Sequence, residues 1–306
     1  MASETELGGY SLLDRIATGG MAEVYRARAL GEPAPGIEEP PEVVLKRLLP
    51  TWRVEQDYVD AFVAEGKLGV RIKHPNLVRT YKVFKKGLDY FMVQELVDGL
   101  NLAQLSEKAR SRKIPLTPAA AVWAALSLLR ALEGLHKLRF GEGAPTVVHC
   151  DVNPSNVLVS KSGELKLTDF GVATPEGSPA VGSGGSIRGT LAYMSPEQVL
   201  GCPVDRRSDL FAAGVVLWEL LANRPLIDAP SHYEAIQRAR ECRVPLLSTL
   251  RNDLPELLVQ IVRKAVFADA SLRFQDAGEF LHALEVLARR SNLALAAESI
   301  APEVAG

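Results

Sequence analysis

The stretch HCDVNPSNVLVSKSGELKLTDFG, which runs from His149 to Gly171, decides the fold. It contains two strand-like runs, 157–160 and 165–168, on either side of a four-residue turn with a glycine. Such a pattern predicts an antiparallel β-hairpin. Continuing the pairing outward from the turn places Asn156 opposite Asp169.

The open end of this predicted hairpin carries oxygen atoms that suit a metal ion. The amide oxygen of Asn156 and the carboxylate of Asp169 are hard ligands of the kind that magnesium prefers, and they leave coordination positions for phosphate. Asp151, on the loop just before, is placed to accept a proton from an incoming hydroxyl group. The alternative is that these residues only cap turns beside buried strands.

The order of these residues resembles the catalytic loop and D-F-G segment of the bacterial Hanks-type serine/threonine protein kinases. The resemblance implies that Asp151 is the catalytic base and that Asn156 and Asp169 are metal ligands. It also implies ATP as the phosphate donor, magnesium or manganese as the metal, and a protein substrate or regulated partner protein. It covers residues 10 to 290, almost the whole chain.

The distribution of element types predicts an α+β fold with two lobes. Strand patterns with one helix fill the first hundred residues, and helical patterns dominate the remainder. We expect a kinase-like arrangement: an N-terminal tail at 1–9, a small β-rich N-lobe at 10–96, a larger helical C-lobe at 97–290 and a C-terminal tail at 291–306.

The helical pattern at 54–70 places a carboxylate on its apolar side. Tyr58, Phe62 and Leu68 fall near one face, and Glu65 lies on the same inward side. A carboxylate on an apolar face is costly unless it is paired. Glu65 therefore calls for a buried cation.

Lys46, at the end of the strand-like run Val43–Leu45, is the candidate cation. In the kinase resemblance this lysine contacts the α- and β-phosphates of ATP, and Glu65 holds it in place. The alternative is an ordinary surface salt bridge.

The segment IATGGMAEV, residues 16–24, resembles the loop that covers the phosphates in kinases. Ala17 and Ala22 stand where the G-x-G-x-x-G pattern has glycine, and Gly19 is the glycine that remains. No Walker loop occurs. The resemblance assigns nucleotide contacts to residues of the strands, the loop and the lobe connection: Ala17, Gly19, Gly20, Val24, Val44, Lys46, Gln94, Glu95, Val97 and Leu158.

Residues 189–197 resemble the end of the kinase activation segment. The resemblance implies that Glu197 pairs with Arg273 and that Asp209 supports the catalytic loop. Cys150 stands where many kinases have an arginine that grips a phosphorylated segment. Candidate phosphorylation sites in the preceding Gly- and Ser-rich segment are Ser178, Ser183 and Ser186.

Asn153 stands where serine/threonine kinases usually have a catalytic lysine. An amide donates a neutral hydrogen bond but carries no charge, so we expect slow transfer of the γ-phosphate to Ser or Thr hydroxyls of proteins. The first alternative is a pseudokinase, a nucleotide-binding scaffold or regulatory module. A second is phosphorylation of a small molecule, which the match at 189–197 disfavours.

Composition excludes several other classes. The 306 residues include 35 Lys and Arg against 37 Asp and Glu, so no positive field favours a nucleic acid partner. The three cysteines form no C-x-x-C pair, and neither a disulfide framework nor a zinc site is predicted. Apolar runs such as 210–221 are short, and the first residues lack a signal pattern. We therefore expect a cytoplasmic protein without a membrane partner.

Overall fold

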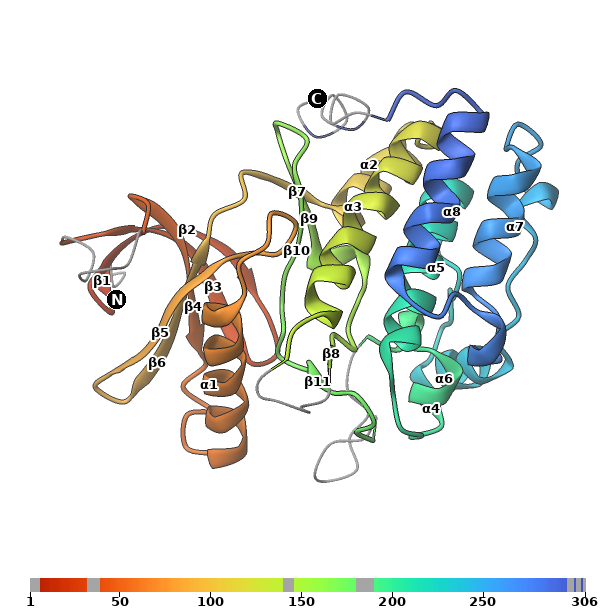
Figure 1. Cartoon of the computed structure of the whole chain (residues 1–306). Coiled ribbons are helices and arrows are strands. Elements are labelled where there is room, and N and C mark those ends of the chain that lie inside the picture. Colours follow the sequence, from red (N-terminus) through yellow and green to blue (C-terminus); the bar gives the residue numbers. More distant parts are fainter. Residues whose placement is uncertain are drawn as a thin grey trace. The chain divides into compact units, whose positions relative to one another are not determined.

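The computed structural model describes residues 6–31, 39–139, 146–179 and 190–295, together with Ile300 and Val304. The chain divides between Val97 and Asp98 into two compact units (Figure 1). Each unit is described by itself.

In the residues that the structure describes, the first unit is a six-stranded antiparallel sheet with one helix, α1 (Gln56–Arg71). The strand order is β1-β2-β3-β4-β6-β5. The strands are β1 (Glu6–Leu7), β2 (Tyr10–Thr18), β3 (Ala22–Ala29), β4 (Glu42–Leu48), β5 (Thr80–Lys86) and β6 (Asp89–Glu95). The predicted N-terminal tail at 1–9 therefore joins the sheet from Glu6 onward, and Leu7 is buried in the core of the unit.

The two faces of this sheet have separate cores, because side chains alternate along a strand. On β6, Phe91 and Val93 belong to one cluster, whereas Met92 packs with Phe62 of α1. The helix approaches β5 closely at Gly69, where an added Cβ would lie 2.3 Å from Thr80 Oγ1. A glycine at this position therefore sets how close the helix lies to the strand.

The predicted helix at 54–70 is confirmed, with a correction to its inward face. Phe62 and Glu65 are buried as predicted, but Tyr58 is exposed and its neighbour Val59 is buried instead. Tyr58 stacks on Trp52 with ring centroids 4.3 Å apart. The pair covers the surface at the start of the helix rather than filling the core.

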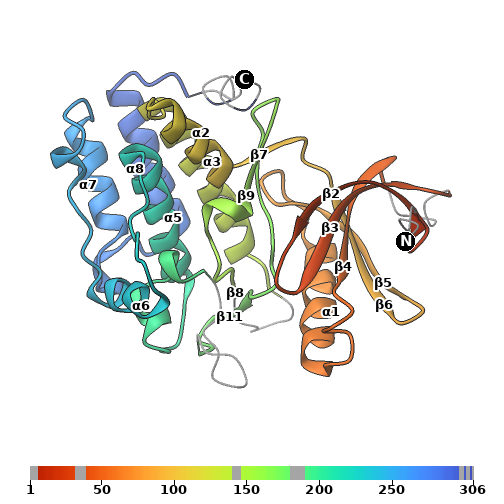
Figure 2. The same ribbon diagram turned by 180° about the vertical axis from the view of Figure 1, so that it is seen from behind.

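The second unit is mainly helical (Figures 1 and 2). Its helices are α2 (Leu102–Arg112), α3 (Pro118–His136), α4 (Pro196–Val199), α5 (Arg206–Ala222), α6 (His232–Glu241), α7 (Glu256–Ala265) and α8 (Ala277–Arg290). Its strands are β7 (Gly99–Asn101), β8 (Val147–Val148), β9 (Val157–Ser160), β10 (Leu165–Leu167) and β11 (Thr174–Pro175). The strands form two small antiparallel sheets, β10-β9-β7 and β11-β8. In Figure 2 the first of these lies beside α2 and α3.

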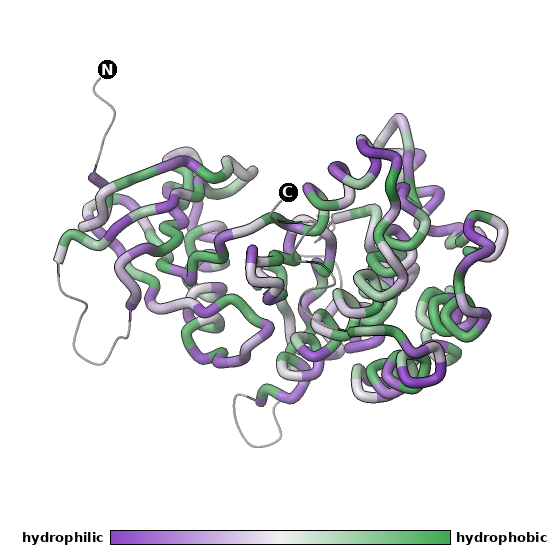
Figure 3. Tube along the Cα trace, turned by 90° about the horizontal axis from the view of Figure 1, so that it is seen from above, coloured by the Kyte–Doolittle hydropathy of each residue, from purple (hydrophilic) through white to green (hydrophobic). Residues whose placement is uncertain are grey.

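The helix α3 is the central helix of this unit and packs against α5 and α8. Thr117 caps its first turn through Ala120 N, and Pro118 follows at the first helical position. Among the helices that the structure describes, α3 is the one whose length and composition would allow it to cross a membrane, but 67% of that window is buried within the protein. Along most of the other helices, hydrophobic and hydrophilic residues alternate (Figure 3), as they do in helices with one buried face.

The predicted hairpin is present as β9 and β10, but its predicted register is wrong by one residue. Val159 pairs with Leu165, so Asn156 lies opposite Thr168 rather than opposite Asp169. The loop has three residues instead of four, because Gly163 adopts a φ of +86° and closes a tighter turn. Asp169 is therefore the first residue beyond the ladder.

The predicted C-terminal tail at 291–306 is also partly packed. Ile300 and Val304, the two residues of its last part that the structure describes, are both buried.

Candidate active site

In the first unit, β4 and α1 bring Lys46 and Glu65 together. Lys46 Nζ lies 2.8 Å from Glu65 Oε1, and the two side chains are 13% and 1% exposed. Val24 of β3 and Met92 of β6 flank Lys46 in the sheet. The predicted burial of Glu65 against a cation is confirmed, and a pair this buried holds the lysine far more firmly than a surface ion pair would.

The loop between β2 and β3 is a tight hairpin turn. Gly19 N donates to Ala22 O over 2.8 Å, and Ala17 pairs with Val24 across the ladder. The carbonyl of Gly20 accepts a 2.7 Å hydrogen bond from Trp52 Nε1. The Trp52 side chain, which follows β4, therefore holds the loop between β2 and β3 in place.

The predicted adenine contacts lie at the end of β6 and on β4. Gln94 is buried opposite Val44, and its Nε2 lies 3.4 Å from Thr80 Oγ1. Glu95 N donates to Arg79 O over 2.8 Å. Val97 ends the first unit, while Leu158 lies on β9 of the second unit. Contact of these residues with a nucleotide stays a prediction.

In the second unit, the carboxylate of Asp151 is held by two donors. Its Oδ1 accepts from Thr190 N at 2.6 Å, and its Oδ2 accepts from Asn156 Nδ2 at 2.9 Å. Asn156 Nδ2 also donates to Asp151 O over 2.9 Å. These donors fix the orientation of the Asp151 carboxylate. Its role in accepting a proton from a hydroxyl group stays a prediction.

Asn153 is buried, and its amide uses its full hydrogen-bonding capacity. Its Oδ1 accepts from Ser155 N at 2.9 Å and from Asn156 N at 3.3 Å, which caps the single 3₁₀ turn Pro154–Asn156. Its Nδ2 donates to Asp151 O and to Thr190 Oγ1, each over 3.1 Å. An amide has two donors and two acceptor lone pairs, and all four are engaged here. Asn153 therefore organises the loop from within.

Asp209 of α5 anchors the start of the catalytic loop. Its carboxylate accepts from His149 N at 2.8 Å and from Cys150 N at 2.9 Å, and it lies 2.7 Å from His136 Nε2. Because the side chain is 1% exposed, these partners are what make its burial tolerable. The predicted supporting role of Asp209 is confirmed.

The assignment of Asn156 and Asp169 as metal ligands remains a prediction, but both residues fit a magnesium ion. Asn156 uses its Nδ2 within the loop, which leaves Oδ1 as the atom able to face a cation. Asp169 follows β10 with a φ of +67°, a left-handed conformation that redirects the chain at this point. Within the described ranges no group of three or more His, Cys, Asp or Glu could hold a metal ion. An amide and one carboxylate suit magnesium that also binds phosphate oxygens.

The end of the activation-like segment is tied to the core by a buried ion pair. Arg273, whose side chain is fully buried, contacts both carboxylate oxygens of Glu197 at 2.7 and 2.8 Å. Burial by itself raises the pKa of Glu197, but the bonds from Arg273 and Ser208 outweigh it and lower that pKa. The predicted pair of Glu197 and Arg273 is confirmed.

Parts of the predicted segment fall outside the described residues, including Gly189, Ser183 and Ser186. Ser178 is half-buried, and its carbonyl accepts from Val204 N. Thr190 belongs to the motif at 189–197, but no contact was predicted for it, and the structure shows that it contacts both Asp151 and Asn153.

The sheet with its buried Lys–Glu pair and the helical unit with its acid-bearing loop together define a protein kinase domain. A family model described as "Protein kinase domain" matches residues 10–282, so the chain belongs to this family. The predicted family and fold are confirmed.

Several relatives and solved structures are similar to this chain. The tyrosine-protein kinase MasK of Myxococcus xanthus is 34% identical over 281 residues, which cover 91% of this chain and 43% of MasK. The serine/threonine-protein kinase PrkC of Bacillus subtilis is 29% identical, with 88% of this chain and 39% of PrkC covered. The chain thus spans about two fifths of these relatives. The crystal structure of a single-site mutant of the Mycobacterium tuberculosis PknI kinase domain matches 94% of this chain and 99% of its own, with a TM-score of 0.67 and 25% identity.

Proposed function

We propose that this domain transfers the γ-phosphate of ATP to Ser or Thr hydroxyl groups of proteins, and that it does so slowly. The observation that carries the proposal is the Asp151 carboxylate, which two donors hold in a fixed orientation immediately before the predicted metal ligands. The buried ion pair of Lys46 and Glu65 supports it, since a lysine fixed in this way suits the phosphates of a nucleotide.

Each side chain has a definite role in this proposal. Asp151 orients the acceptor hydroxyl and takes its proton, and Lys46 holds the α- and β-phosphates. Asn156 and Asp169 hold magnesium or manganese. When bound, that ion neutralises the charge that develops on the transferring phosphoryl group.

The low rate follows from Asn153. Its amide is committed to the loop, and it supplies no positive charge beside the transferring group. Loss of one preorganised donor costs about a hundredfold to a thousandfold in rate. Because Lys46, Asp151 and Asp169 are retained, we propose slow transfer rather than none.

The second candidate is a pseudokinase that binds nucleotide and regulates a partner protein. The same observation on Asn153 favours it, together with Ala17 and Ala22 in the phosphate-covering loop, where side chains restrict the approach of the backbone. The identity of the acceptor residue is a further question, because MasK is named as a tyrosine kinase and PrkC as a serine/threonine kinase. We propose Ser and Thr, in a cytoplasmic protein.

The deciding experiment measures transfer of labelled phosphate from ATP to a generic protein acceptor with magnesium or manganese. Wild-type protein is compared with Asp169→Ala and Asp151→Asn, and the labelled residue is identified by acid hydrolysis. We expect phosphoserine or phosphothreonine that depends on both aspartates. Nucleotide binding without transfer above the Asp169→Ala background would favour the pseudokinase, and phosphotyrosine would reassign the acceptor.

A further inference from the structure

Trp52 contacts both the phosphate-covering loop and the helix that carries Glu65. Its Nε1 donates to Gly20 O over 2.7 Å, and its ring stacks on that of Tyr58 of α1, with centroids 4.3 Å apart and an interplanar angle of 23°. All of these residues belong to the first unit. The roles proposed above for the transfer reaction assign nothing to Trp52.

A second set of contacts joins the same loop to the same helix. Met21 O accepts a 2.9 Å hydrogen bond from Leu49 N, and Trp52 N donates to Leu49 O over 2.9 Å. Ala22 is 4% exposed and belongs to the core cluster that contains Phe62 of α1, and Met21 and Trp52 pack against that cluster. The loop and the inner face of α1 therefore share one apolar core. Because such a core is closely packed, a shift of one requires a shift of the other.

The bond to Gly20 O also sets the direction of the next backbone donor. In a planar trans peptide the C=O and N–H groups point in opposite directions. Because Gly20 O points to the indole of Trp52, Met21 N–H points away from it. Backbone N–H groups of turns are donors for phosphate oxygens. The indole thus decides which way one of these donors faces.

The helix end of these contacts reaches the lysine of the site. Glu65 lies three residues after Phe62 on α1 and holds Lys46 Nζ at 2.8 Å. We propose that Trp52 is a positioning residue for the nucleotide: it orients the phosphate-covering loop on α1, so that the loop and the pair of Lys46 and Glu65 are placed together for the phosphates. This role rests on the proposed function, which supplies ATP as the ligand.

Binding of ATP and of adenosine, measured by calorimetry with magnesium, tests the positioning role without catalysis. Trp52→Phe keeps a ring that can stack on Tyr58 and removes the N–H donor. Since one hydrogen bond is lost, ATP should bind about fivefold more weakly, whereas adenosine, which has no phosphates, should bind unchanged. An equal loss for both ligands, or no loss for ATP in the folded variant, would overturn the role.

Tyr58→Ala tests the link to the helix. Tyr58 is exposed on α1 and is not one of the predicted nucleotide contacts. Its removal leaves the indole bond to the loop in place but takes away the stacking partner, so ATP should bind about threefold more weakly and adenosine unchanged. Tyr233→Ala, the same change at an exposed site on α6, is the matched control. Unchanged ATP affinity in a folded Tyr58→Ala protein would overturn the coupling to α1.

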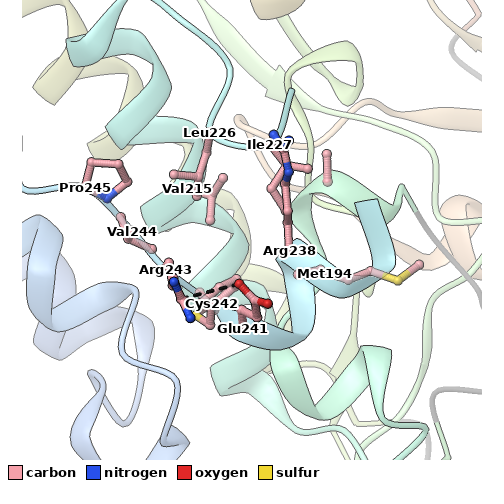
Figure 4. A pocket seen from close by; sticks show the side chains of 13 residues that line it. Met194, Val215, Leu226, Ile227, Arg238, Glu241, Cys242, Arg243, Val244 and Pro245 are labelled. Carbon is pink, nitrogen blue, oxygen red and sulfur yellow. Dashed lines mark ion pairs between the residues drawn. The ribbon is translucent and has the colours of Figure 1, made fainter. Parts of the chain in front are cut away.

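Trp218→Phe separates positioning from general stability. Trp218 Nε1 donates to Pro245 O over 2.9 Å, so this variant loses an indole-to-carbonyl bond of the same kind within the second unit. Pro245 lines the apolar pocket shown in Figure 4. We expect the melting temperature to fall while the affinity for ATP is kept. A loss of ATP affinity equal to that of Trp52→Phe would overturn the role, because destabilisation alone would then weaken binding.

Hydrogen exchange without nucleotide tests the hold of Trp52 on the loop by itself. The amides of Gly19 and Leu49 donate to carbonyls of the loop, and in Trp52→Phe they should exchange about fivefold faster than in the wild type. Unchanged exchange would overturn the hold. If the wild type binds no ATP, the proposed function and the positioning role both fail, while the exchange result still decides the hold. ATP binding without transfer would contradict the proposed transfer alone.

Discussion

Replacement of Asn153 separates the role of charge from the role of the loop capping bonds. Asn153→Lys and Asn153→Met introduce side chains of similar length, and only the first carries a charge. Both remove the Oδ1 acceptor that caps Ser155 N and Asn156 N, at a cost of about 1 kcal/mol in the free energy of unfolding. The Nδ2 bonds to Asp151 O and Thr190 Oγ1 add about 1 kcal/mol each, which a lysine ammonium can replace and a methionine cannot.

We therefore expect the methionine variant to be less stable than the wild type by about 3 kcal/mol and the lysine variant by about 1 kcal/mol. At about 2 to 4 °C per kcal/mol, these losses are resolved in a thermal melt. In a phosphate-transfer assay well below both melting transitions, the lysine variant should exceed the wild type by about a hundredfold, and the methionine variant should not. Equal rates for the two folded variants would refute the view that a missing cation limits the reaction.

Three further substitutions test the charged pairs. Glu65→Gln should lower the transfer rate by about a hundredfold, because it releases Lys46 from its fixed position, and should also lower the free energy of unfolding, because it removes the negative charge that faces a buried lysine; an unchanged rate in the folded variant would contradict this. Arg273→Met leaves the Glu197 carboxylate buried without its partner and should lower the free energy of unfolding by about 3 to 5 kcal/mol, against about 0.5 or less for an exposed arginine such as Arg243. Glu176 bonds to Arg206, which lowers the pKa of Glu176 from 4.5 to about 2. The pair therefore adds stability above about pH 4.5 that is lost as the pH falls towards 2, so the difference between wild type and Glu176→Gln in chemical unfolding should shrink over that range.

Burial arguments predicted the ion pair between Lys46 and Glu65 correctly, but local patterns did not predict the position of Tyr58 or the register of the hairpin. Glu65 on an apolar helix face required a cation, and the structure supplies Lys46 at 2.8 Å. The same helical pattern misplaced Tyr58, because an amphipathic residue at the start of a helix can stack on a neighbouring ring, here Trp52, as easily as enter the core. The hairpin register failed for a similar local reason: one glycine with a positive φ shortens the loop and shifts every pair by one.

The bonds of Asn153 could not be predicted from the sequence for a different reason. Its contact with Thr190 spans 37 residues, and no periodicity or spacing rule links the two positions. From the sequence, Asn153 marks only the loss of a lysine. The structure shows that its amide forms four hydrogen bonds. A chain that replaces a catalytic residue can retain the geometry of the loop while changing its charge.

That geometry depends on α5 as well as on the side chain of Asn153. Asp209 binds the backbone amides of His149 and Cys150, so a buried carboxylate fixes the start of the loop just before Asp151. Backbone amides are available whatever side chains the loop carries, so these two bonds do not depend on the cysteine side chain at position 150. The Oδ1 atom of Asp151 is instead held by Thr190 N. The carboxylate of Asp151, the proposed catalytic base, is therefore held from the segment through Thr190, while the loop that carries it is held from the core through Asp209.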